Sequence, residues 1–223
     1  MRAGFYQRWI VANGWAEALG LGSTFVLGRI AAPRLEGLSG VGPVLFTAAL
    51  AIALGIVLEG WLVGVAQAAV LGERLPRLCS RAWILATMVG AGLAWGIGMI
   101  PSTVMALLAP SGAEGPPPVD PGPLIVYPAA MMLGAATGPI LGLAQWTTLK
   151  RHVPRAGRWL WANAAAWTLG MPAIFLGMDV VPWTAGLAAV VPAIYAVCGV
   201  AGLLVGAVHG RVLDLLTRET TGP

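Results

Sequence analysis

The chain has 223 residues, of which 58% are hydrophobic and 10% are charged, with a formal net charge of +4 at pH 7. A soluble domain carries roughly 25% charged residues, so this composition excludes a water-soluble globular protein and indicates a surface that faces lipid. Two cysteines outside any Cys/His cluster exclude a disulfide framework. The basic residues cap hydrophobic segments, which argues against a nucleic-acid partner.

Six apolar segments are long enough to cross a bilayer as helices, which takes about 20 residues each. Their continuous apolar runs, without period-two alternation, predict helices and not barrel strands. The first segment contains Glu17 and has no clear cleavage site, so we expect a span and not a signal peptide. The fold class is therefore an all-α polytopic membrane bundle. In chain order the predicted spans are approximately 9–27, 44–71, 83–108, 124–149, 159–178 and 183–208.

Basic residues predict the orientation of these spans. Eleven of the 13 Lys and Arg residues lie at the N-terminus, in the second and fourth connections or in the C-terminal tail. By the positive-inside rule this face is cytoplasmic, so we expect both termini inside the cell, in a bacterial inner membrane. The one long connection, residues 109–123, is acidic and rich in Pro and Gly, which predicts an irregular extracytoplasmic loop.

Two motifs alternate along the chain and predict an internal repeat. The first, GxxxGxx[QH]xxxL, closes each even span, and the second, WxxA[NT], opens each odd span. A threefold tandem repeat of helical hairpins follows, with units 1–72, 73–150 and 151–223 in one transmembrane domain. The copies of the first motif are Gly60, Gly64, Gln67 and Leu71; Gly138, Gly142, Gln145 and Leu149; and Gly202, Gly206, His209 and Leu213. The copies of the second begin at Trp9, Trp83 and Trp159.

The chemistry of both motifs suits helix packing. Glycines four residues apart let another membrane helix approach closely, and tryptophans at helix starts favour the headgroup boundary. Six polar motif residues lie at similar depth and could form one polar layer. That layer is either interhelical hydrogen bonding or a polar constriction or cytoplasm-facing binding site. Its predicted members are Asn13, Gln67, Thr87, Gln145, Asn163 and His209.

Two carboxyl groups, those of Glu17 and Glu59, lie deeper in the predicted spans, with no Lys or Arg at matching depth. Ionisable residues inside a membrane are functional candidates by default. Aligned on the motifs, the other repeats have Ala91 and Trp167 in place of Glu17, and Thr137 and Ala201 in place of Glu59. The acids therefore break the repeat. They are either a site that handles protons or cations, or neutral carboxyls bonded to neighbouring helices.

The sequence carries no HExxH, GxSxG or Walker motif and no Cys/His metal cluster. We therefore expect no enzyme, no metal and no cofactor. The leading interpretation is a non-enzymatic structural or accessory subunit of a membrane assembly. Its expected partners are the lipid bilayer and a membrane protein or a second copy of the chain. The alternative is a small transporter or channel with Glu17 and Glu59 on the path, including a proton-coupled one.

The segment GxxxGxxQWxxL (Gly138 to Leu149), followed by a basic turn and a Trp-opened helix, resembles a group of uncharacterised bacterial multi-pass membrane proteins with repeated blocks of this type. The resemblance covers most of the chain and implies no activity. The sequence departs from the pattern after Gln67 and His209, where the Trp is missing. Six spans with both ends inside also resemble the substrate-binding subunits of energy-coupling factor transporters, whose small-residue docking motif is similar to Ala12 and Ala16.

Overall fold

The computed structural model describes residues 4–35, 40–108 and 122–218, which are helical with no strand. This confirms the all-α class. The helices are α1 (Phe5–Leu35), α2 (Val41–Leu54), the π-helix η1 (Gly55–Gly60), α3 (Trp61–Leu71), α4 (Ser80–Leu108), α5 (Pro123–Leu149), α6 (Arg158–Asp179) and α7 (Leu187–Arg218). Because α2, η1 and α3 follow one another without a break, they form a single long helix.

Five of the described helices are long and apolar enough to cross a membrane. They are α1, the continuous α2–η1–α3 helix, α4, α5 and α7. The sixth, α6, has 22 residues that include Arg158, Asn163, Thr168 and Asp179, which lower its hydropathy. The fold is therefore compatible with a multi-pass membrane protein, and the sixth crossing stays a prediction.

The helix ends differ from the predicted spans. Helix α1 continues to Leu35, and α7 begins at Leu187 and continues to Arg218. Asp214, which the sequence placed in a C-terminal tail, is therefore helical and buried. Hydropathy finds only the apolar part of a helix, so a helix that continues beyond that part is cut short. Most of the predicted loop 109–123 lies outside the described residues, and its last residue, Pro123, begins α5.

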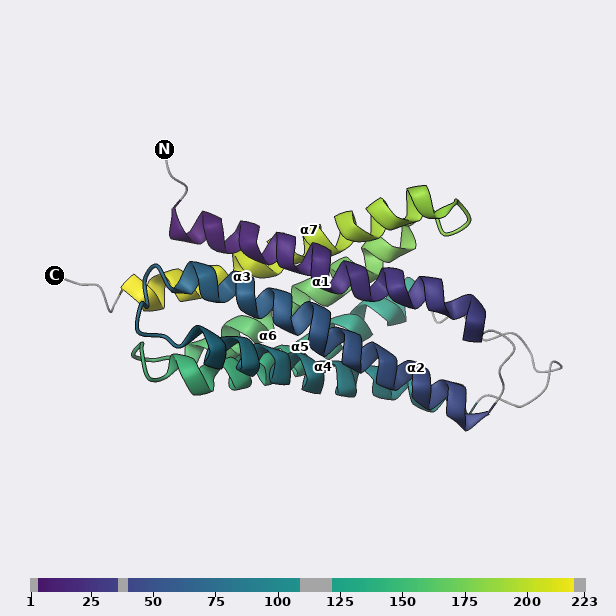
Figure 1. Ribbon diagram of the computed structural model, residues 1–223, viewed down its shortest axis with the longest axis horizontal. Helices are drawn as coiled ribbons and strands as arrows, with labels where there is room; N and C mark the ends of the chain where they lie inside the picture. Colours follow the sequence, from purple (N-terminus) through teal and green to yellow (C-terminus); the bar gives the residue numbers. More distant parts are fainter. Residues whose placement is uncertain (1–3, 36–39, 109–121, 219–223) are drawn as a thin grey trace.

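Among the described residues the helices form a closed ring in which each contacts two neighbours. Helix α1 contacts α7 and the α2–η1–α3 helix, α4 lies between that helix and α5, and α6 lies between α5 and α7. Helix α1 begins and α7 ends at the same end of the bundle, which we call the terminal end (Figure 1). From there α1, the α2–η1–α3 helix and α7 diverge toward the opposite end (Figure 1).

Close backbone approaches join each GxxxG helix to the tryptophan-opened helix beside it. A Cβ on Gly64 of α3 would lie 2.9 Å from the Ile84 Cα of α4. A Cβ on Gly142 of α5 would lie 3.1 Å from the Leu160 Cα of α6. Helix α7 meets α1 in the same way, because a Cβ on Gly206 would lie 3.1 Å from the Ile10 Cα. The same contact therefore recurs three times around the ring, the third time between the two ends of the chain.

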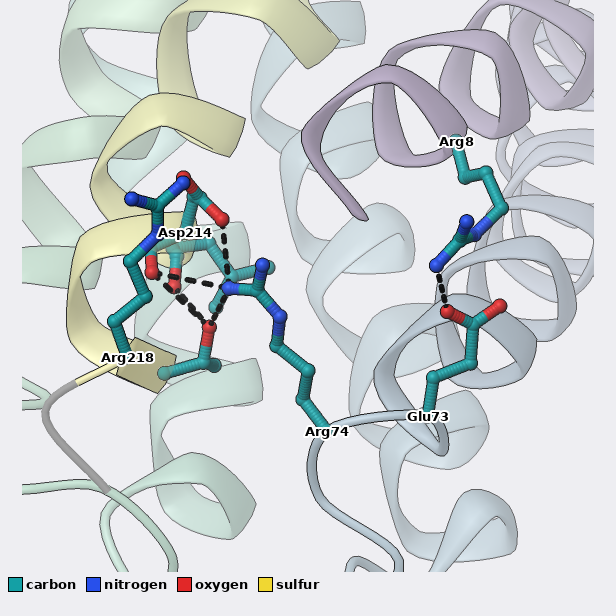
Figure 2. Close-up of polar contacts among 7 residues, drawn as sticks. Arg8, Glu73, Arg74, Asp214 and Arg218 are labelled. Carbon is teal, nitrogen blue, oxygen red and sulfur yellow. Dashed lines mark hydrogen bonds and ion pairs between the residues drawn. The ribbon is translucent and has the colours of Figure 1, made fainter. Parts of the chain in front are cut away.

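Charged residues hold the connection after α3 against both α1 and α7 (Figure 2). An Arg74 Nη1 atom lies 2.6 Å from Asp214 Oδ1 and donates a 2.9 Å hydrogen bond to Thr217 Oγ1. Arg218 Nη2 lies 2.8 Å from the other Asp214 oxygen. On the neighbouring side of the same connection Glu73 pairs with Arg8 of α1. These contacts join the α3–α4 connection to α1 and to α7 at the terminal end of the ring.

The two ion pairs should contribute unequally to stability. Asp214→Asn removes a buried charge between two arginines, and we expect it to lower the free energy of unfolding by about 1–3 kcal/mol. Glu73→Gln breaks a pair whose side chains are 37% and 43% exposed, so its effect should stay below about 1 kcal/mol. Thermal unfolding of both variants in lipid nanodiscs measures the difference. Equal losses would contradict the role given to Asp214.

A second stability prediction concerns the α5–α6 contact. A Cβ on Gly134 would lie 2.0 Å from the backbone oxygen of Trp167, so Gly134→Ala must push the two helices apart. Such overpacking costs about 1–3 kcal/mol. The matched control is Gly96→Ala in α4, where nothing lies within 4 Å and alanine favours the helix. We expect a lower melting temperature for Gly134→Ala alone, and an equal fall in both variants would refute the close contact.

Candidate functional site

Three tryptophans point into the ring near its terminal end. Trp9, Trp83 and Trp159 are fully buried, although sequence reasoning placed them at the headgroup boundary. Each indole N–H donates to the Gln or His of a GxxxGxx[QH]xxxL motif in the adjacent helix. That helix is α3 for Trp83, α5 for Trp159 and α7 for Trp9. The bonds are Trp83 to Gln67 Oε1 at 3.2 Å, Trp159 to Gln145 Oε1 at 2.9 Å and Trp9 to His209 Nδ1 at 3.0 Å. Since an indole N–H only donates, His209 Nδ1 must be the acceptor, so this histidine takes the place of a glutamine oxygen.

The structure brings the six predicted polar residues together in the layer next to these rings. Each of the six is exposed by 2% or less. Gln67 Nε2 donates to Asn13 Oδ1 at 2.9 Å, and Gln145 Nε2 donates both to Gln67 Oε1 at 2.8 Å and to Thr87 Oγ1 at 3.0 Å. His209 accepts from Trp9, whereas Asn163 Nδ2 donates to the Trp159 carbonyl of its own helix and its Oδ1 has no hydrogen-bond partner among the described residues. This set, Asn13, Gln67, Thr87, Gln145, Asn163 and His209, is the polar layer.

An apolar cluster covers the polar layer on the side of the terminal end. It contains the three buried tryptophans together with Leu71, Leu149 and Leu213, each of which is fully buried. The tryptophan rings touch one another, with centroids 6.0 Å apart for Trp9 and Trp159. Hydrogen bonding among helices therefore accounts for the contacts of Asn13, Gln67, Thr87 and Gln145, and leaves Asn163 Oδ1 without a partner among the described residues.

Gln145 is the residue that tests this interpretation. Gln145→Leu leaves Trp159, Gln67 and Thr87 each without one buried hydrogen bond, which should cost about 1–3 kcal/mol in total. The control is Thr147→Val on the exposed side of the same helix. We expect a lower melting temperature for Gln145→Leu and no change for Thr147→Val. If Gln145→Leu instead raised ion leakage through liposomes without loss of stability, the layer would be a constriction.

Glu59 lies in the π-helix η1, farther from the terminal end than the polar layer. Its Oε2 atom accepts a 2.7 Å hydrogen bond from Trp95 Nε1 of α4. The Trp95 ring lies against Gly55, where a Cβ would be only 2.2 Å from the ring. A π-helical turn widens a helix locally and occurs frequently at functional sites. The glycine and the widened turn together position an indole donor over the Glu59 carboxyl group.

Glu17 of α1 lies beside Glu59 but in a more enclosed position. It is 3% exposed, and its side chain crosses Gly202 of α7, where a Cβ would lie 2.6 Å from the Glu17 Cβ. Its Oε2 atom has no hydrogen-bond partner among the described residues. The Glu17 and Glu59 carboxyl groups are close enough to interact electrostatically. Counting 1.5 Å per residue, Glu17 lies about 18 Å from the start of α1, near the middle of a hydrocarbon layer of about 30 Å.

A cavity of about 220 Å³ lies inside the ring next to Glu59. Its wall comes from α1, η1, α4, α5 and α6, and it is apolar apart from Glu59 and Thr137. Thr137 Oγ1 already donates to the Leu133 carbonyl of its own helix. Of the described residues in the wall, Glu59 is the one that can ionise. We call this space the central cavity.

The central cavity occupies the layer in which the three repeated sequences differ. Six positions align with Glu17 and Glu59, and four of them line the cavity. The four are Glu59, Ala91, Thr137 and Trp167. The other two, Glu17 and Ala201, are buried behind it. Toward the terminal end the motifs repeat and the interior is filled, whereas in this layer the small side chains of Ala91 and Thr137 leave space.

Sequence reasoning found both acids but missed Trp95 and the cavity. The pairing of residues between α3 and α4 could have predicted the position of Trp95. Gln67 pairs with Trp83 in these antiparallel helices, so twelve residues before Gln67 and twelve after Trp83 the pairing places Gly55 opposite Trp95. Gly55 is one helical turn from Glu59. Among the described residues no group of three or more His, Cys, Asp or Glu side chains could hold a metal ion. Comparison with protein-family models, curated proteins and solved structures found no match.

Proposed function

We propose that this chain is a non-enzymatic six-helix membrane protein that binds a small, mainly apolar molecule in the central cavity. It would act as a small transporter or as the substrate-binding subunit of one. The observation that carries the proposal is a cavity inside the ring whose apolar wall holds a carboxyl group. An ionisable side chain at the depth of the membrane interior is costly and is therefore a functional candidate, and small molecules usually bind in apolar pockets with a few polar groups.

The membrane arrangement is part of the same proposal. Helix α6 would be the sixth crossing, since 22 residues span about 33 Å as a helix. The terminal end would face the cytoplasm, because it carries basic residues such as Arg74, Lys150 and Arg211. Three equivalent tryptophan bonds and three equivalent glycine contacts support a threefold tandem repeat.

A ring that serves only as a scaffold has no need of the central cavity. Helices in a membrane associate by close packing, and empty space removes contacts that would stabilise them. The packed layers toward the terminal end have the character expected of a scaffold. The central cavity, by contrast, sits beside a widened turn and a carboxyl group. We therefore place the binding function in the layer of the central cavity and the structural role in the packed layers toward the terminal end.

The second candidate function, a structural or accessory subunit, is favoured by helix α2. None of its 14 residues is buried, although the helix belongs to the ring. Its outer face would be covered by lipid, by a second copy of the chain or by a partner membrane protein. A stoichiometric partner that copurifies in mild detergent, and whose removal lowers the melting temperature, would support this function.

Filling the central cavity tests the binding function. Ala94 lines the cavity, so Ala94→Leu should occupy it, while Ala135→Leu adds the same atoms to an exposed position on α5. We expect compounds of about ten non-hydrogen atoms that raise the melting temperature of the unmodified protein to lose that effect, at least tenfold in concentration, in Ala94→Leu only. Thermal-shift titration in nanodiscs measures this. Equal stabilisation of both variants would place the compounds elsewhere and contradict the proposal.

A further inference from the structure

We propose that the ligand of the central cavity is a compact organic cation, an ammonium group on an apolar body, with its charge held by Glu59. The inference rests on the proposed binding function and names the chemical class of its ligand. It follows from three features of the cavity: the acidic character of its ionisable group, the free acceptor on Glu59, and the scarcity of other polar atoms in the wall.

The ionisable side chains in and next to the central cavity are both acids. Glu59 is in the wall, Glu17 lies behind it, and the wall contains no Lys, Arg or His among the residues that the structure describes. A carboxylate in an apolar environment is costly unless a cation or a proton accompanies it. A ligand that enters with a positive charge removes this cost, whereas an anionic ligand adds to it.

Glu59 has an acceptor left for such a ligand. The one hydrogen bond described for its carboxyl group comes from Trp95 and reaches Oε2. A carboxylate has two oxygens with about four acceptor positions, so Oε1 can accept from an ammonium N–H while Trp95 keeps its bond. Glu59 is also partly exposed in the wall, in contrast to Glu17. The indole therefore orients the carboxyl group toward the cavity without saturating it.

The remainder of the wall suits an organic body and not a bare metal ion. Metal cations such as Ca²⁺ require six or more oxygen ligands, and Thr137 is the other wall side chain with an oxygen. The wall instead contains aromatic rings, including those of Trp95 and Trp167, which attract cations and cover apolar groups. A volume of about 220 Å³ corresponds to about seven water volumes, or roughly ten non-hydrogen atoms.

Glu17 is expected to have a weaker effect on affinity than Glu59. It does not line the cavity, and its carboxyl group lies against Gly202, so it would act on the ligand only through its charge. Glu17→Gln should therefore reduce binding of a cation less than Glu59→Gln does. This order separates a contact with the ligand from a general effect of negative charge.

The test uses three probes of similar size and different charge on the protein in lipid nanodiscs at pH 7. They are 2-phenylethylammonium, the neutral 2-phenylethanol and the anion phenylacetate. We expect the ammonium ion to bind at least tenfold tighter than the alcohol, and phenylacetate to bind weakest, by isothermal titration calorimetry. Glu59→Gln should lower affinity for the ammonium ion at least tenfold and leave affinity for the alcohol unchanged, which also shows that the variant is folded. Glu73→Gln is the matched control and should change neither.

The inference is overturned if the ammonium ion binds no tighter than the alcohol, or if Glu59→Gln leaves its affinity unchanged. The charge series on the unmodified protein gives this answer even if Glu59→Gln does not fold. If the alcohol or phenylacetate binds best and Ala94→Leu abolishes that binding, the cavity is a binding site and only the ligand class is wrong. If none of the three probes binds, the cation inference fails and the proposed binding function loses its support as well.

Discussion

The need to satisfy every buried polar group without water governs this structure. Inside a bilayer an unpaired N–H or carbonyl group costs several kcal/mol, so each must find a partner within the protein. Near the terminal end the protein does this with one recurring interaction, in which a buried tryptophan N–H donates to a glutamine or histidine on the adjacent helix. That bond fixes the register of three helix pairs, and the third pair joins the two ends of the chain into a ring.

This constraint also shows why the layer of Glu17 and Glu59 differs from the rest. In the polar layer most donors and acceptors are matched, and Gln145 alone takes part in three side-chain bonds, while Asn163 Oδ1 has no hydrogen-bond partner among the described residues. About one to two turns farther along the helices, Trp95 donates a hydrogen bond to Glu59, while Glu17 Oε2 has no hydrogen-bond partner in the described structure. A cavity next to unpaired hydrogen-bond acceptors is suited to a ligand that carries hydrogen-bond donors.

The sequence predicted the helices and the polar layer because both depend on local pattern. Apolar length marks the helices, and three copies of GxxxGxx[QH]xxxL and WxxA[NT] mark the residues that meet. What it could not predict depends on which way a side chain points. Hydropathy alone does not distinguish a Trp83 that points into the ring from one at the lipid boundary. It also left Asp214 outside the last predicted span, whereas the structure pairs Asp214 with Arg74. The central cavity has no signature in any one segment, since five helical segments line it.

The division between a packed half and a binding layer is the central claim, and the melting temperature of Glu59→Gln tests it most directly. A glutamine keeps an acceptor for Trp95 and removes a carboxyl group that no described cation accompanies in the unliganded protein. If this layer serves binding, the variant should therefore melt at the same temperature as the unmodified protein or higher, as is common where residues serve function and not stability. A fall as large as that caused by disrupting the polar layer would mean that Glu59 holds the ring together, and would contradict the claim.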